Sequence, residues 1–175
     1  MDGPYTCGAG VQRQQLEAWC QELSVPLHVL NSTQTLETLE CYSCSRERRS
    51  LMFKMAKSLD IDAIAFGHHR DDLVETTLMN LFVKGDFAGM LPRVPMKKYG
   101  VTIIRPLIFA HEKAIIEFAR QQGFLRITCR CPVGQTSVRK KTKDLIGEIK
   151  EIFPQAESNI ELAVLRQGSQ AALEP

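Results

Sequence analysis

The sequence contains no long apolar run, no leader-like N-terminus and no repetitive tract, and each absence excludes a class of protein. No stretch approaches the ~18 apolar residues that a membrane-spanning helix needs, which excludes a transmembrane protein. The N-terminus, Met-Asp-Gly-Pro-Tyr-Thr-Cys, lacks the charged and then apolar pattern of a signal peptide, so we expect a cytoplasmic protein. The lack of internal repeats and low-complexity segments excludes an array of short repeated units.

The composition is that of a soluble globular protein, with 44% hydrophobic and 24% charged residues. A length of 175 residues is enough for one domain with a sizeable core and too short for two of ordinary size. Segments with helical apolar spacing alternate with short β-like runs, which predicts an α/β domain with a parallel sheet. Residues 84–100, rich in glycine and proline, are predicted to be a loop. The predicted helices span residues 11–24, 70–83, 111–122 and 137–153, with a last helical segment after Pro154. A further helix is predicted to start at the Cys41–Cys44 pair, with Leu51, Met52, Met55 and Leu59 on one face. The predicted strands span residues 26–30, 62–67 and 101–109.

Charge is distributed unevenly along the chain, although the net charge is only +2. Residues 126–150 carry seven bases and two acids, whereas residues 151–175 carry one base and four acids. A basic segment on an otherwise balanced body is typical of a protein that binds a polyanion at one place. The bases between residues 139 and 150 lie on a predicted helix, where phosphate binding and a merely solvated helix face are both open interpretations.

Six cysteines occur in the chain, and their spacing indicates metal ligands rather than disulfides. Disulfides are uncommon in a reducing cytoplasm, where clustered cysteines more often bind metal or act as catalytic groups. Cys41 and Cys44 form a Cys-x-x-Cys pair that can bind one metal, with Cys131 as a third ligand. Structural zinc normally has four ligands, for which Cys129 or His111 would be needed. Three cysteines fit an iron–sulfur cluster with one open iron better.

Two other residues that could carry chemistry have simpler explanations, and a third stays open. Cys20 lies on the apolar face of a predicted helix, so we expect it in the core. His28 is a lone histidine in an apolar strand-like run and is expected to be structural. Cys7, near the N-terminus, stays unassigned.

The segment Gly67-His-His-Arg-Asp-Asp72 follows a predicted strand and opens a predicted helix. Ligands bind outside the carboxyl ends of the strands in open parallel sheets, so this position suits a functional site. Asp71 and Asp72 have the chemistry to hold Mg²⁺ against phosphates or to position a reacting group. Helix capping is the alternative, because Asp72 and Glu75 have capping-box spacing and a helix dipole favours acids in the first turn.

Several motifs occur together in one order along the chain, and together they carry a family resemblance. They are Cys41-Tyr-Ser-Cys-Ser-Arg-Glu-Arg-Arg49, Gly67-His-His-Arg-Asp-Asp-Leu-Val-Glu-Thr-Thr-Leu-Met-Asn-Leu-Phe82, Gly89-Met-Leu-Pro92, Ile104-Arg-Pro-Leu107 and Cys131-Pro-Val-Gly-Gln135. Over roughly residues 1–153 the chain resembles the tRNA 2-thiocytidine synthetase family (TtcA), within the ATP-pyrophosphatase group of tRNA-thiolating enzymes. The combination of the Gly-His-His-Arg-Asp-Asp segment with the upstream Cys-x-x-Cys is specific, although each part alone is not.

The resemblance implies a Rossmann-like fold of the adenine-nucleotide α-hydrolase type and an ATP-dependent chemistry. Members of the family adenylate a tRNA base with ATP and Mg²⁺, and then replace the activated oxygen with sulfur carried by a [4Fe-4S] cluster. The matching cluster ligands are Cys41, Cys44 and Cys131, with Cys129 as an alternative third ligand. The other matches line the nucleotide and catalytic site: Asp71, Asp72 and Arg48 as catalytic residues, and Gly67, His68 and Arg105 as nucleotide-binding residues.

The partners implied by the resemblance are tRNA and a sulfur donor such as a cysteine desulfurase, whereas a homodimer is left open. The basic helix would then contact the tRNA backbone. Residues 1–125 are expected to form a partial ATP-pyrophosphatase α/β domain. Residues 126–175 are expected to form a basic helical extension with a polar tail.

The phosphate-binding loop of the family, of the type Ser-Gly-Gly-Lys-Asp-Ser, is missing from the sequence. Such a loop supplies the backbone N–H groups that bind phosphate at a helix N-terminus. We therefore expect an N-terminally truncated chain that is inactive by itself, either because of a misplaced start codon or because it is a fragment. The alternatives are a catalytically dead metal- or cluster-binding protein that docks tRNA, and a zinc-stabilised α/β domain without a nucleic-acid role.

Overall fold

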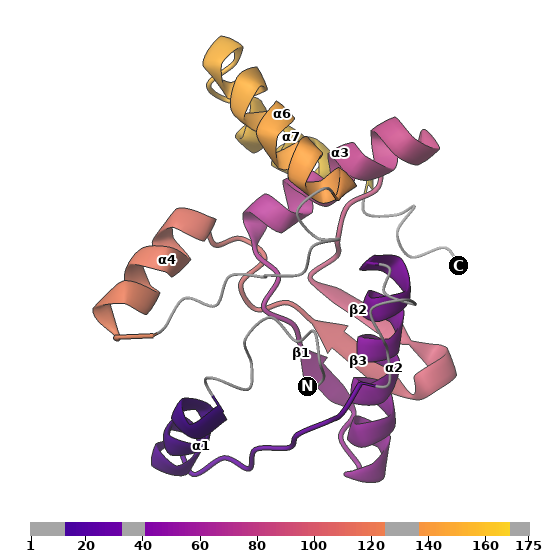
Figure 1. The fold of residues 1–175 in the computed structure, drawn as a ribbon. Helices are drawn as coiled ribbons and strands as arrows, with labels where there is room; N and C mark the ends of the chain where they lie inside the picture. Colours follow the sequence, from indigo (N-terminus) through magenta and orange to yellow (C-terminus); the bar gives the residue numbers. More distant parts are fainter. Residues whose placement is uncertain (1–12, 33–40, 125–136, 169–175) are drawn as a thin grey trace. The chain divides into compact units, whose positions relative to one another are not determined.

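The computed structural model describes residues 13–32, 41–124 and 137–168, which divide between two compact units (Figure 1). The first unit holds the described residues up to Met55 together with Ser137, and the second holds residues 56–124 and 138–168. Within these ranges, no helix has both the length and the apolar character that a bilayer crossing requires.

The first unit contains α1 (Arg13–Glu22) and most of α2 (Cys41–Ser58). α2 begins at Cys41, so Cys41 and Cys44 both lie in its first turn, and the cysteine pair stands at a helix start as predicted. The prediction of a strand at residues 26–30 is wrong, since these residues make no strand pairing and a strand needs a hydrogen-bonded neighbour. His28 is accordingly exposed, and Cys20 is half-buried rather than part of a core.

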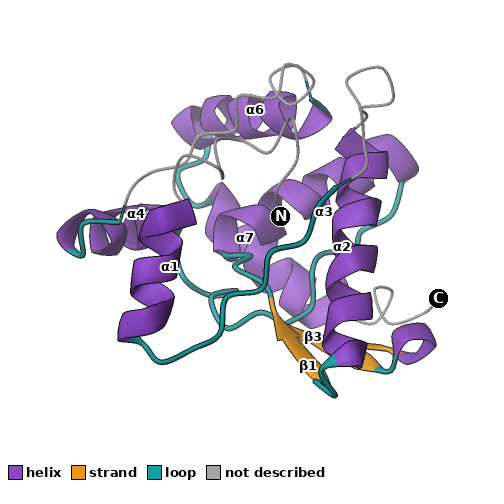
Figure 2. Cartoon of the chain, turned by 60° about the horizontal axis from the view of Figure 1, so that its bottom comes forward, coloured by secondary structure: helices purple, strands orange, loops and turns teal. Residues whose placement is uncertain are grey.

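The second unit is built on a three-stranded sheet with the strand order β1-β3-β2. β1 (Ala63–Ala65) pairs in parallel with β3 (Val101–Ile104), and β2 (Arg93–Met96) pairs antiparallel with the other edge of β3. The α/β class predicted from the sequence is confirmed, with a mixed rather than a purely parallel sheet. Figure 2 shows β1 and β3 side by side, and their register brings the carboxyl ends at Ala65 and Ile104 together.

Two strand predictions differ from the structure because of proline. β2 lies inside the predicted loop, and its Pro95 is tolerated because an edge strand leaves one side of the backbone unpaired. The predicted strand at residues 101–109 ends instead at Ile104, since Pro106 cannot donate to the ladder and the chain turns there. This turn places Ile108 in the core, where its side chain is 1% exposed.

The remaining helices lie within a few residues of their predicted positions. Gly85, with φ 74°, ends α3 in the left-handed conformation that glycine adopts readily, and its N–H donates to the carbonyl of Leu81 at 3.0 Å. The elements of the second unit are α3 (Arg70–Lys84), the short 3-10 helix η3 (Lys97–Tyr99), α4 (Glu112–Gln121), α6 (Val138–Ile152), α7 (Ala156–Ala163) and the π-helical turn η4 (Val164–Gly168).

α3 is the element on which the core of the second unit is assembled, and both α6 and α7 contact it (Figure 1). Leu73 packs against Ile108 and Val164, and a second cluster joins Val74 and Leu78 to Ile146 of α6. Each fully buried apolar side chain contributes about 1.5–3 kcal/mol to this packing. The core therefore fixes the helix whose N-terminus follows β1.

We expect the substitution Gly89→Ala to destabilise the chain by about 1–3 kcal/mol, the usual cost of overpacking a core. A Cβ at this position would come within 2.6 Å of Cγ1 of Val164 and 2.7 Å of Cδ1 of Leu73, both in fully buried side chains. Urea unfolding measures the change. Gly147→Ala is the matched control: a Cβ there meets no atom within 4 Å, and alanine in α6 should add up to ~1 kcal/mol. If the Gly89→Ala variant is as stable as the wild type, the close packing of Val164 and Leu73 around Gly89 is wrong.

Candidate functional site

The segment between Gly67 and Asp72 lies at the carboxyl ends of the parallel strands, as predicted. The N–H of Phe66 donates to the carbonyl of Ile104 at 2.9 Å, so the chain stays beside β3 after β1 ends. The N–H of Arg70 then donates to the carbonyl of Ala110 at 3.0 Å. These bonds bring the first turn of α3 next to the segment that follows β3, which is where ligands bind in open α/β sheets.

His68 and Arg105 come from these two segments and contact each other. Nε of Arg105 donates to Nδ1 of His68 at 3.3 Å, and its Nη1 donates to the carbonyl of Leu91. The His68 ring also packs against the Phe66 ring, with centroids 5.4 Å apart. Burial, together with the Arg105 charge, lowers the pKa of His68, so the ring is neutral at pH 7. Because Nδ1 accepts from Arg105, the proton of the neutral ring lies on Nε2, which can donate to a ligand.

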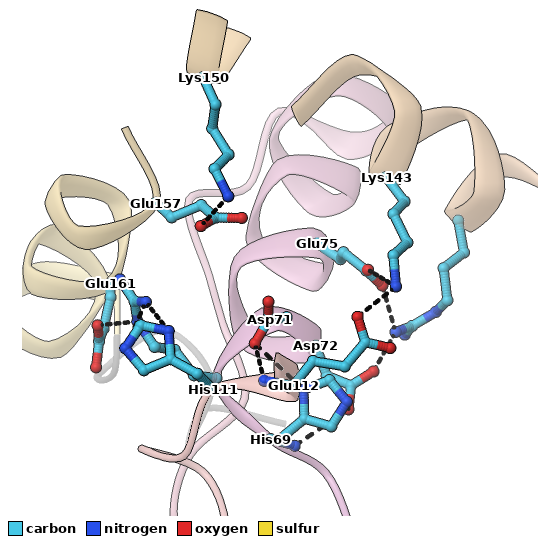
Figure 3. A network of polar contacts seen from close by, with 12 residues as sticks. His69, Asp71, Asp72, Glu75, His111, Glu112, Lys143, Lys150, Glu157 and Glu161 are labelled. Atoms are coloured by element: carbon cyan, nitrogen blue, oxygen red, sulfur yellow. Dashed lines mark hydrogen bonds and ion pairs between the residues drawn. The ribbon is translucent and has the colours of Figure 1, made fainter. Parts of the chain in front are cut away.

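Asp71 connects α3 to α4 (Figure 3). Its Oδ2 accepts a hydrogen bond of 2.7 Å from the N–H of Glu112, the first residue of α4. A carboxylate at this place satisfies an otherwise unpaired amide and interacts favourably with the helix dipole. The other oxygen, Oδ1, accepts no hydrogen bond from the described residues, and the side chain is 24% exposed. Asp71 thus combines a structural contact with an oxygen that a ligand can reach.

Both carboxylate oxygens of Asp72 accept hydrogen bonds from other residues of the chain. Oδ2 accepts a bond of 3.1 Å from the N–H of His69, and Oδ1 accepts a bond of 2.9 Å from Nη1 of Arg139. A capping box is present at the start of α3, as the capping interpretation predicts, but it joins His69 to Asp72. The expected pairing of Asp72 with Glu75 is wrong, because α3 begins at Arg70 and Asp72 is already inside its first turn.

Glu75 is buried beside these groups and depends on two cations from α6 (Figure 3). Nη1 of Arg139 donates to its Oε2 at 3.1 Å, and Nζ of Lys143 lies 4.0 Å from its Oε1. Burial raises the pKa of Glu75, while Arg139 and Lys143 oppose that rise. Burial also acts to lower the pKa of Lys143, but the hydrogen bond to Glu112 and the charges of the nearby acids together outweigh this effect, so the pKa is raised.

Arg70, the first residue of α3, is a buried cation whose exposed fraction is 4%. Its guanidinium pairs with Glu161 through Nε, donates to Oγ of Ser158 at 3.0 Å and lies 2.7 Å from Nδ1 of His111. His111 occupies the N-cap position of α4 without a side-chain capping bond. Its ring accepts from the guanidinium, which disfavours it as a zinc ligand, and the described residues contain no group of three His, Cys, Asp or Glu side chains placed for a metal ion.

The basic helix predicted to contact tRNA is α6, and its cations are largely paired. Arg139 and Lys143 bind the acids of α3 and α4, while Lys140 pairs with Asp144 and Lys150 with Glu157 at 2.8 Å. Of the lysines and arginines in α6, Lys141 alone makes no ion pair within the described residues. The structure therefore favours an intramolecular role for this helix over a phosphate-binding face.

The other predicted site residues are divided between the two units or lie outside the described residues. Gly67 has open space where a Cβ would lie, so the backbone itself does not require glycine there. Arg48 is exposed on α2 in the first unit, and Cys44 is half-buried in the first turn of the same helix. Cys131 and its alternative Cys129 lie outside the described residues, as does Cys7.

Sequence reasoning missed the buried charges that organise this site. Glu75 stands between Val74 and Leu78 on the buried side of α3, and a charge on an apolar helix face was the signal that could have revealed it. The partners of Glu75 and Arg70 lie 64 and 91 residues further along the chain, in α6 and α7. No local pattern marks contacts of that kind.

We expect Arg139→Met to destabilise the chain by about 1–2 kcal/mol at pH 7, because Glu75 and Asp72 lose their shared cation. This is below the ~3–5 kcal/mol typical of fully buried pairs, since the Arg139 side chain is 43% exposed. A raised pKa means that ionised Glu75 costs stability as the pH rises above its ordinary value of 4.5. Losing Arg139 raises that pKa further, so the destabilisation should shrink as the pH falls from 7 toward 4.5.

Urea unfolding at the two pH values measures this effect. Lys141→Met is the matched control on the same helix, since this exposed lysine pairs with no described acid, and it should change stability by less than ~0.5 kcal/mol. An Arg139→Met loss of equal size at both pH values would contradict the assignment of the effect to the carboxylates.

Comparison with known proteins connects this site to a family. A family model described as the PP-loop domain matches residues 9–126, more than half of the chain. The tRNA-cytidine(32) 2-sulfurtransferase of Geobacter metallireducens is 38% identical over 116 residues, covering 65% of this chain and 45% of the relative. That of Legionella pneumophila subsp. pneumophila is 34% identical over 154 residues, covering 83% of this chain and 54% of the relative. The chain thus spans about half the length of the curated relatives that it matches.

A solved structure gives an independent comparison of the fold. The U34-tRNA thiolase NcsA from Methanococcus maripaludis, solved with its [4Fe-4S] cluster, aligns with a TM-score of 0.68 over 88% of this chain and 55% of that chain. At 19% sequence identity this likeness establishes the fold alone. The resemblance inferred from the motifs is confirmed: the chain belongs to the PP-loop domain family and is similar to its tRNA-cytidine(32) 2-sulfurtransferases.

Proposed function

We propose that the chain takes part in the 2-thiolation of a tRNA base, through ATP-dependent adenylation of the base and sulfur transfer at a [4Fe-4S] cluster. The observation that carries this proposal is the 34–38% identity to tRNA-cytidine(32) 2-sulfurtransferases. The matched PP-loop region includes both the Cys41–Arg49 and the Gly67–Asp72 motifs. The fold is shared with a tRNA thiolase that carries a [4Fe-4S] cluster, which is compatible with the same chemistry.

Adenylation is proposed for the site at the carboxyl ends of β1 and β3, with ATP and Mg²⁺ as cofactors. Asp71 keeps one carboxylate oxygen for a ligand such as Mg²⁺, while Asp72 holds the first turn of α3 through its cap and its ion pair. Arg105 would stabilise negative charge on the transferred phosphate, and the neutral His68 ring would donate from Nε2. Gly67 leaves open space beside these groups, and Arg48 is the further catalytic residue that we propose.

Cluster binding is proposed for Cys41, Cys44 and Cys131, with Cys129 as the alternative third ligand. Cys41 and Cys44 occupy positions i and i+3 in the first turn of α2, and residues at this spacing are neighbours on one helix face. Soft thiolates are the ligands that iron–sulfur clusters use, so the donor set fits the group. When bound, a cluster with three protein ligands supplies an iron that holds the sulfur to be transferred.

The proposed partners are tRNA and a sulfur donor such as a cysteine desulfurase, acting in the cytoplasm, and a homodimer stays open. We further propose that residues 1–125 form part of an ATP-pyrophosphatase domain and residues 126–175 a helical extension. The 175 residues contain no Ser-Gly-Gly-Lys-Asp-Ser-type loop, so we propose that this sequence by itself does not hydrolyse ATP.

Anaerobically purified protein is expected to contain iron and sulfide and to show the broad visible absorption of an iron–sulfur cluster. Each of Cys41→Ala, Cys44→Ala and Cys131→Ala should abolish this absorption, because the cluster would lose a ligand. Cys20→Ala is the matched control, since Cys20 is a half-buried cysteine on α1 outside the motif. Iron analysis and absorption spectra provide the measurement. Stoichiometric zinc without iron would reject the cluster and favour the zinc-stabilised alternative.

Deleting the gene is expected to remove one 2-thio nucleoside from bulk tRNA, as measured by mass spectrometry of tRNA digests. A chromosomal Asp71→Asn substitution should strongly reduce the same nucleoside because the site loses a carboxylate charge, whereas Lys141→Met should leave it at the wild-type level. An unchanged profile in the deletion strain would favour the second candidate function, a catalytically dead protein that docks tRNA.

A further inference from the structure

A long stretch of the second unit has no acidic residue. Between Asp86 and Glu112 the sequence contains four arginines and lysines and no aspartate or glutamate. Three of these bases, Arg93, Lys97 and Lys98, belong to the hairpin that β2, η3 and β3 form. Gly100 closes this hairpin with φ 67°, a conformation that favours glycine.

The three hairpin cations are exposed, and none of them pairs with an acid among the described residues. Lys98 lies 5.9 Å from the centroid of the Tyr99 ring, a contact that leaves its ammonium group in water. The cations of α6 differ, because Arg139 and Lys143 form ion pairs with buried or half-buried acids. The hairpin therefore presents the unpaired positive charge that the sequence led us to expect on α6.

The register of the sheet connects this charge to the candidate site. β2 is an edge strand, and Arg93 pairs with Ile104 at the end of β3 that leads into Arg105 (Figure 1). The N–H of Arg105 also donates to the carbonyl of Pro92 at 2.8 Å. Lys97 follows four residues after Arg93, or roughly 13 Å along an extended strand. The cations thus run along the sheet edge, from the site to the tip of the hairpin.

We propose that the β2–β3 hairpin binds the phosphate backbone of tRNA and leads a tRNA segment to the site at the carboxyl ends of β1 and β3. The proposal rests on the proposed function, which supplies tRNA as the polyanion. Unpaired lysines and arginines are the groups that release counterions when they bind phosphates. The hairpin exposes no large apolar side chain, which a docking surface for a protein or a membrane would need.

The test compares two variants of the full chain with the same change in charge. Lys97→Glu/Lys98→Glu alters the hairpin, and Lys113→Glu/Lys141→Glu alters exposed lysines of α4 and α6 that pair with no described acid. Fluorescence anisotropy with labelled tRNA, at several salt concentrations, gives the dissociation constant and its salt dependence. We expect the hairpin variant to bind at least ~10-fold more weakly and the slope of log K against log salt to fall by roughly 2, with little change for the control.

Lys97→Gln/Lys98→Gln provides the same readout if the double glutamate variant does not fold, and Arg93→Gln should lower the slope by roughly 1. Wild-type affinity in the hairpin variants, an equal loss in the control, or the absence of tRNA binding by the wild-type chain would each overturn the proposal. Binding to vesicles with anionic lipid in preference to tRNA would overturn it as well. The thionucleoside profile distinguishes a failure of the proposed thiolation function from a failure of the hairpin proposal. A normal profile with hairpin-dependent binding rejects the thiolation function alone, and a lost nucleoside with hairpin-independent binding rejects this inference alone.

Discussion

The first two turns of α3 carry ionic groups that must be compensated from elsewhere in the chain, and the second unit is arranged to meet this requirement. An isolated buried charge costs several kcal/mol, so Arg70 and Glu75 require partners. α7 supplies Glu161 to Arg70, and α6 supplies Arg139 to Glu75. The apolar contacts of α3 bring these helices close, and the ion pairs determine which of their residues face the N-terminus of α3.

The same arrangement lets one acidic pair serve the structure and the proposed chemistry. Asp71 holds the first residue of α4 and still has an oxygen that accepts no hydrogen bond from the described residues, whereas both oxygens of Asp72 accept hydrogen bonds. A carboxylate held by a helix amide is already oriented, so a ligand that approaches it does not have to order it. The proposed thiolation activity would use the strand-to-helix turn in this way.

The distribution of charge shows why a count along the chain is a poor guide to a binding surface. The segment with the largest net positive charge contains α6, yet the folded chain pairs most of the α6 cations with acids. The hairpin around β2 lies within residues 1–125, whose charges balance to zero as a whole, and its cations pair with no acid among the described residues. Affinity for a polyanion depends on unpaired charge, which is a property of the fold.

The sequence by itself was sufficient for those features that depend on neighbours in the chain. The helical spacing of apolar residues predicted α3, α4 and α6 closely, and the Gly67–Asp72 motif after a predicted strand placed the candidate site at a strand end. It could not predict β2, because glycine and proline favour a loop locally, and only pairing with β3 makes this segment a strand. Nor could it predict the pairing of Glu75 with Arg139 or of Arg70 with Glu161. Such contacts join residues 64 and 91 positions apart, and only tertiary packing brings them within hydrogen-bonding distance.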